Sequence, residues 1–133
     1  MKKGKPISRI QFELILKRFI IYLKAQLNFK HDIPVILVDN PEFSKEIGAF
    51  GEISSKNVIH ISIINRHPVD ILRTVAHEYE HYKQHLQRGI PHAGSHSSKA
   101  GSMIENQANA KAGELLRKYG QLHPELFDYM SIR

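Results

Sequence analysis

The chain reads HEYEH from His77 to His81, and the segment around this stretch decides the fold. Just before it, apolar residues recur at the spacing of one helical face: Ile71, Leu72, Val75 and Ala76. Side chains four positions apart lie on the same face of a helix, so His77 and His81 can reach one cation. Two imidazoles on successive turns, with Glu78 between them, are typical of a metal site that activates water.

Glu105 is the expected third ligand, on the next long helical segment. It shares a helical face with small or apolar residues: Ala108, Ala112, Leu115 and Leu116. A carboxylate on such a face is costly to bury unless it is paired or bound to a metal. Three protein ligands would leave the fourth tetrahedral position of zinc free for water. The alternative is a buried Glu105 that pairs with a lysine or arginine.

Three further histidines compete for a role in this site. His85 extends the face of His81 by one turn, which places it farther from the metal, as a supporting or exposed residue. His92 and His96 lie in the segment 89–101, which is rich in Gly, Ser and His. Either is an alternative ligand to Glu105, or a donor to a transition-state oxyanion. A tyrosine is a further candidate for that last role.

The composition indicates a soluble globular domain. The chain has 133 residues, of which 41% are hydrophobic and 24% charged, and this suits a single domain over 1–133. It contains no cysteine, which excludes disulfides, thiolate zinc ligands and a cysteine nucleophile. A metal in this protein must therefore be held by histidine and carboxylate.

The charge pattern bears on partners and location. No apolar run is long enough to span a membrane, and the basic residues near Lys5 are not followed by a secretory signal. We therefore expect a cytoplasmic protein without a membrane partner. The net charge is +6, with an excess of Lys and Arg in residues 1–30. This favours an ordinary basic protein over a nucleic-acid binder, although the basic N-terminal segment leaves nucleic acid open as a partner.

The hydrophobic periodicity predicts an α+β fold with an N-terminal helix and a small three-stranded mixed sheet. The predicted helices span 8–28, 68–88 and 98–119, and a short final helix starts at Pro124. The predicted strands span 33–38, 48–53 and 58–64, with a turn at 54–57. One face of the first helix should pack on the core: Phe12, Ile15, Leu16, Phe19, Leu23 and Leu27. A second apolar stripe, Ile10, Leu14 and Ile21, could be an interaction surface or could lie under another element.

A known family is similar to this chain over about 48–116. HEYEH, followed by ENQAN from Glu105 to Asn109, resembles the gluzincin metallopeptidases and is closest to the small ImmA/IrrE-type proteins of bacteria and phages. The resemblance implies a zincin-like fold, in which an H-E-x-x-H helix precedes a glutamate-bearing helix and Zn²⁺ is bound by His77, His81 and Glu105. The chain departs from the family at Glu80, where many relatives carry glycine, and in the segment 89–101, which does not align.

The resemblance also implies an activity. It is the hydrolysis of peptide bonds in a protein or peptide substrate, by a zinc-activated water with Glu78 as general base. The strand at 58–63 resembles the edge strand on which zincins bind extended substrates, with an interior strand as the alternative. Three other functions stay open: a non-catalytic zincin-fold binding protein, a protease acting on DNA-associated proteins, and a zinc hydrolase of another class, such as an amidase.

Overall fold

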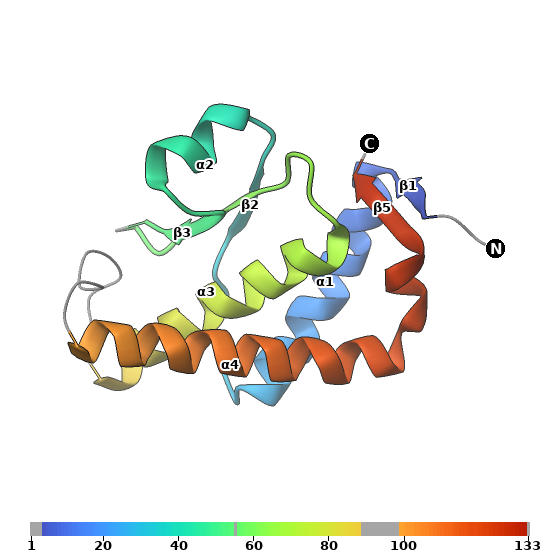
Figure 1. Cartoon of the computed structure of the whole chain (residues 1–133). Helices are drawn as coiled ribbons and strands as arrows, with labels where there is room; N and C mark the ends of the chain where they lie inside the picture. The colour runs from blue at the N-terminus through green and yellow to red at the C-terminus, as the bar shows by residue number, and fades with distance from the viewer. Residues whose placement is uncertain (1–3, 55, 89–98, 133) are drawn as a thin grey trace.

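The computed structural model describes residues 4–54, 56–88 and 99–132 (Figure 1). These residues form four α-helices, one short 3₁₀ helix and five strands. A three-stranded mixed sheet lies between helix α2 on one side and the helices α1, α3 and α4 on the other (Figure 1). The α+β class and the mixed sheet predicted from the sequence are therefore confirmed. Among the described residues, no helix has the length and apolar character needed to cross a bilayer.

Helix α1 spans Arg9–Gln26 and begins at a capping box. The Ser8 hydroxyl accepts a hydrogen bond from the Gln11 N–H, and the Gln11 side chain accepts one from the Ser8 N–H, which satisfies two backbone donors at the helix start. The predicted core face is confirmed, since Phe12, Leu16, Phe19, Leu23 and Leu27 are buried and Ile15 packs against them. The second stripe, Ile10, Leu14 and Ile21, is exposed.

The three-stranded sheet has the order β2-β4-β3, and its central strand is β4 (Ile59–Ser62). Strand β2 (Val35–Val38) runs parallel to β4, and β3 (Gly51–Ile53) runs antiparallel to it. The expectation that residues 58–63 form the edge strand was therefore wrong. The physical reason is that both edges of β4 are hydrogen-bonded, one to β2 and the other to β3. Both faces of β4 are covered as well. Ile59 and Ile61 are fully buried in the core, while the His60 ring lies 6.3 Å from Phe43 of α2.

The two outer strands differ in how their free edges are covered. On β2, the carbonyl of Leu37 accepts a hydrogen bond from the Arg9 guanidinium at 3.1 Å. On β3, the Phe50 carbonyl bonds to β4 through Ser62 N–H at 2.8 Å. Hydrogen-bonded and non-hydrogen-bonded residue pairs alternate along an antiparallel ladder. The backbone N–H and C=O groups of Gly51, and of Ile53 at the end of β3, therefore point away from β4. No described residue pairs with this edge, and it is open to an added strand.

Helix α2 (Pro41–Ile47) was not predicted, although its boundaries are marked in the sequence. The Asn40 side chain accepts a hydrogen bond from the Glu42 N–H, and Pro41 occupies the first turn, where its missing N–H is not needed. Gly48 ends the helix in the left-handed conformation at φ 66°. The helix was missed for two reasons. Asn40 and Pro41 can equally mark the end of a strand, and the seven residues of α2 are too few to show a periodic apolar pattern.

The two long helices follow the prediction closely. Helix α3 spans Pro68–Arg88, the bounds predicted from the sequence, and α4 spans Lys99–Leu122. Helix α4 passes through Gly120, where the sequence predicted its end. A Cβ at Gly120 would lie 2.9 Å from Cε2 of Phe127, so this glycine lets the aromatic ring pack on the helix and does not terminate it.

The end of the described chain pairs with its beginning. The short final helix predicted from Pro124 is the 3₁₀ helix η1 (Pro124–Asp128). It leads into β5 (Tyr129–Ile132), which runs parallel to β1 (Lys5–Ile7) in a separate two-stranded sheet. This pairing was not predicted, because neither strand is long enough to show alternation.

Candidate metal centre

Two helices bring the candidate ligands together. His77 and His81 lie on α3 and Glu105 lies on α4, and the two helices run side by side (Figure 1). Ala76 on α3 and Ala108 on α4 are fully buried. Such small side chains let two helices approach closely. Small residues at these two positions therefore allow the close approach of α3 and α4 on which the ligand group depends.

The ligand atoms form a compact group. His77 Nε2 lies 2.7 Å from Glu105 Oε1, and His81 Nε2 lies 3.1 Å from Glu105 Oε2. The two Nε2 atoms are 2.9 Å apart. These three residues form a group that could hold a metal ion, with one ligand atom from each within 4.8 Å of the others. Tetrahedral zinc with bonds near 2.0–2.1 Å separates its ligands by about 3.3 Å, so small side-chain shifts suffice to admit it.

Both imidazoles are oriented by a second hydrogen bond. His81 Nδ1 lies 3.0 Å from Oε1 of Gln84, a residue only 3% exposed. A side-chain hydrogen bond also joins His77 to Asn109. Such partners fix which ring nitrogen carries the proton and leave the other for the metal. The sequence did not identify them, although Gln84 lies one turn after His81 and Asn109 lies one turn after Glu105.

Replacement of Gln84 by Leu is expected to weaken zinc binding about 10- to 100-fold, because His81 loses the acceptor that orients its ring. The measurement is a zinc titration in competition with a chelator of known affinity. Gln121→Leu is the control, since this residue is exposed near the end of α4. Equal zinc affinity in the wild type and Gln84→Leu would show that the hydrogen bond has no part in metal binding.

Glu78 does not belong to the ligand group, but its carboxylate is beside it. Its side chain lines the same groove as His77 and Glu105, and only 8% of the residue is exposed. Burial raises the pKa of Glu78 to about 8, and the negative charges of Glu105 and Glu52 add to this effect. A divalent cation bound by the ligand group would oppose the shift, since a nearby positive charge favours the ionised carboxylate.

The environment of His77 favours the neutral imidazole. Burial lowers the pKa of His77, and the neighbouring His81 lowers it further. Glu105 and Asn109 act in the opposite direction without reversing the shift. Metal ligation requires the neutral ring, so the site holds His77 in the protonation state that binds a cation.

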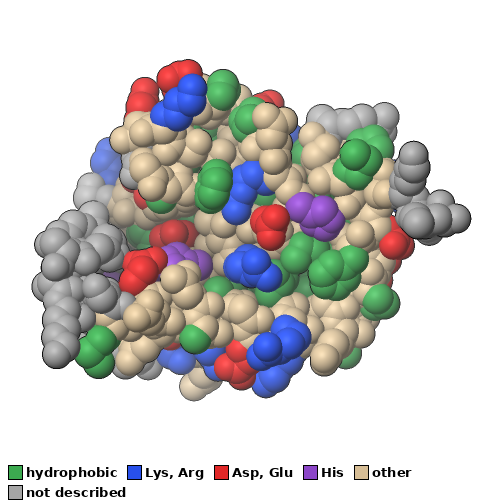
Figure 2. All heavy atoms as spheres, in the orientation of Figure 1, with side chains coloured by type: hydrophobic (Ala, Val, Ile, Leu, Met, Phe, Trp, Pro, Cys, Tyr) green, Lys and Arg blue, Asp and Glu red, His purple; other side chains and the backbone are tan. Residues whose placement is uncertain are grey.

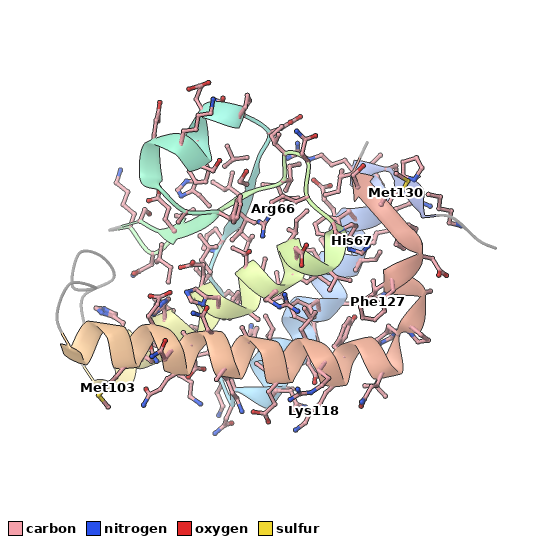
Figure 3. The ribbon with its side chains drawn as sticks, in the orientation of Figure 1. Arg66, His67, Met103, Lys118, Phe127 and Met130 are labelled. Atoms are coloured by element: carbon pink, nitrogen blue, oxygen red, sulfur yellow. The ribbon has the colours of Figure 1, made fainter. Side chains whose placement is uncertain are left out.

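An open groove of about 490 Å³ runs past these side chains. In Figure 2, histidine, acidic and basic side chains gather along the hollow between the sheet and α4. The loop between β4 and α3 contributes Arg66 and His67, which Figure 3 shows above the first turns of α3. The remaining lining comes from the same loop, from β3 and the residue pair before it, and from α3 and α4: Ala49, Phe50, Gly51, Asn65, Asp70, Arg73, Thr74, His77, Glu78, Glu105 and Asn109.

The other candidates from the sequence do not join this group. His85 is not among the grouped ligands, and its ring lies 6.3 Å from that of Tyr82. His92 and His96 lie outside the described residues. Among the described residues that line the groove there is no tyrosine. Sequence reasoning missed Arg66, although it lies in the loop that leads directly into the motif helix.

Comparison of the chain with protein-family models, with curated proteins and with solved structures finds no match. The functional assignment therefore rests on the geometry of the ligand group and on the chemistry of the residues around it.

Proposed function

We propose that the protein is a zinc-dependent metallopeptidase of the gluzincin type. The observation that carries the proposal is the convergence of His77, His81 and Glu105, while a further carboxylate, that of Glu78, lies in the same groove. A purely structural zinc site needs no such carboxylate. The arrangement of the ligands on two packed helices also supports the resemblance to the ImmA/IrrE-type proteins.

The metal and the protein side chains would contribute different parts of the reaction. When bound, zinc supplies Lewis-acid activation of water and of the substrate carbonyl. Glu78 then acts as general base, accepting a proton from the attacking water on its carboxylate and passing it to the leaving amine. Glu105 and the two imidazoles hold the cation. Gln84 and Asn109 keep the imidazoles in the required orientation.

The open edge of β3 is the proposed binding site for the substrate backbone. An extended peptide can add to this edge as a further strand through the outward-pointing backbone groups of Gly51. A Cβ at Gly51 would lie 2.7 Å from Thr74 Cγ2 and 3.4 Å from Glu78 Oε2. The strand can approach α3 this closely only because residue 51 is glycine, and the approach places an added peptide beside the general base.

Removal of the metal tests the proposal. We expect the purified protein to cleave members of a library of unstructured peptides, to lose this activity completely on treatment with a chelator, and to regain it when stoichiometric Zn²⁺ is added. Mass spectrometry of the products identifies the bonds that are cleaved. Cleavage that survives full chelation would contradict the metal mechanism. A zinc-loaded protein that cleaves no peptide would contradict the proposed activity.

A further inference from the structure

Arg66 is held rigidly in the wall of the groove. Its guanidinium donates hydrogen bonds to the Ser62 carbonyl at 3.0 Å, the Asp70 carbonyl at 3.1 Å and the Thr74 hydroxyl at 2.6 Å. It also stacks on the Phe50 ring, 4.3 Å from the ring centroid. The preceding residue, Asn65, adopts a left-handed conformation with φ 52°. The guanidinium is therefore pre-organised before any ligand arrives.

The guanidinium of Arg66 makes no close ion pair with a described residue, although the Asp70 carboxylate attracts it at longer range. Its three hydrogen-bond partners are two carbonyls and a hydroxyl, all neutral. The neighbouring Asp70 carboxylate is paired instead with Arg73, at 3.6 Å. Burial lowers the pKa of Arg66 and Asp70 opposes that shift, but an arginine stays protonated at neutral pH. A partly buried cation without an ion pair, in the wall of an open groove, favours an anionic ligand.

The position of Arg66 relative to Glu78 limits which anionic group of a substrate it can bind. The guanidinium is bonded to Thr74, which precedes Glu78 by one helical turn. Four residues of α-helix rise about 6 Å, which is roughly the length of two residues of an extended peptide. A substrate lying along β3 would therefore place a group two residues from its scissile bond near Arg66.

We infer that Arg66 binds a carboxylate of the peptide substrate, about two residues from the bond that is cleaved. This inference rests on the proposed peptidase function. The carboxylate has two possible sources: the free C-terminus of a short peptide, or the side chain of an internal Asp or Glu. The first would make the enzyme remove short C-terminal fragments, and the second would make it cleave internally beside acidic residues.

Two pairs of fluorescent peptides distinguish these sources. One pair differs only in a free or an amidated C-terminus, and the other, amidated throughout, carries Glu or Gln at internal positions. Binding is measured by fluorescence anisotropy on the zinc-loaded Glu78→Gln protein, in which the peptides are not consumed. We expect the carboxylate peptide of one pair to bind about 10- to 100-fold more tightly than its neutral partner, as a charge-assisted hydrogen bond implies.

Variants of the protein test whether Arg66 causes the preference for the carboxylate peptide. Combined with Glu78→Gln, Arg66→Met should remove the preference, and Arg66→Lys should restore only part of it, because lysine lacks the planar fork of donors. Arg9→Met, which alters an arginine bonded to the Leu37 carbonyl outside the groove, should leave the preference intact. Unchanged zinc content would show that the site of each variant is still folded.

The outcomes separate this inference from the proposed activity. Equal binding of both members of each pair to the protein with Arg66 intact would overturn the inference, whether or not the wild type cleaves peptides. A preference that survives Arg66→Met would also overturn it. A wild type that cleaves nothing would overturn the peptidase function, while the binding comparison would still report on the carboxylate site.

Discussion

Replacement of Glu78 by Gln is expected to lower the rate of peptide hydrolysis by at least about 100-fold, while zinc remains bound with its full stoichiometry. Glutamine keeps the size of the side chain and its place in the groove, but it cannot accept the proton of the attacking water. Glu78 is not one of the grouped ligand residues, so the loss should appear in kcat and leave metal affinity nearly unchanged.

The measurement pairs steady-state kinetics with metal analysis of the same samples. Glu114→Gln is the control, because it makes the same chemical change at a solvent-exposed glutamate that pairs with Lys118. If Glu78→Gln retains full activity, the general base is a different group. If wild type and variant are both inactive but bind zinc equally, the non-catalytic alternative becomes the better description of the protein.

Part of this site follows from sequence because it is local. The helical spacing fixes the face shared by His77 and His81, and the apolar pattern of α4 fixes the side on which Glu105 lies. Both depend on residues a few positions apart. The bounds of α3 were predicted for the same reason: a proline opens the helix, and an apolar stripe runs along it.

The remainder depends on contacts between distant parts of the chain. The alternation in β4 is the same whether the strand is central or at an edge, and only the pairing of β2 and β3 along its two edges decides the matter. The open edge of β3 and the stacking of Arg66 on Phe50 likewise arise from tertiary packing. The glycine at position 51 is the one local hint, because a glycine within a strand often marks a close backbone approach.

Replacement of Glu105 by Ala is expected to weaken zinc binding by more than 100-fold. Structural zinc sites with four ligands bind with roughly 10–16 kcal/mol, so one ligand contributes on the order of 3 kcal/mol. His81→Ala should have a similar effect, since each variant leaves two protein ligands. Metal analysis after dialysis against a weak chelator, followed by a competitive titration, measures both variants.

Thermal unfolding separates loss of a ligand from general damage to α4. A ligand that binds only the folded state adds about 4 kcal/mol at a thousand times its Kd, so zinc should raise the unfolding midpoint of the wild type markedly. Glu105→Ala should unfold near the metal-free wild type and respond little to zinc, whereas Glu114→Ala should respond fully. Glu105 is the only ligand on α4 within the described group, so this pair of variants tests whether the metal joins the two helices. If Glu105→Ala kept the full zinc response, the carboxylate would be a hydrogen-bond partner of the histidines, and the gluzincin assignment would fail.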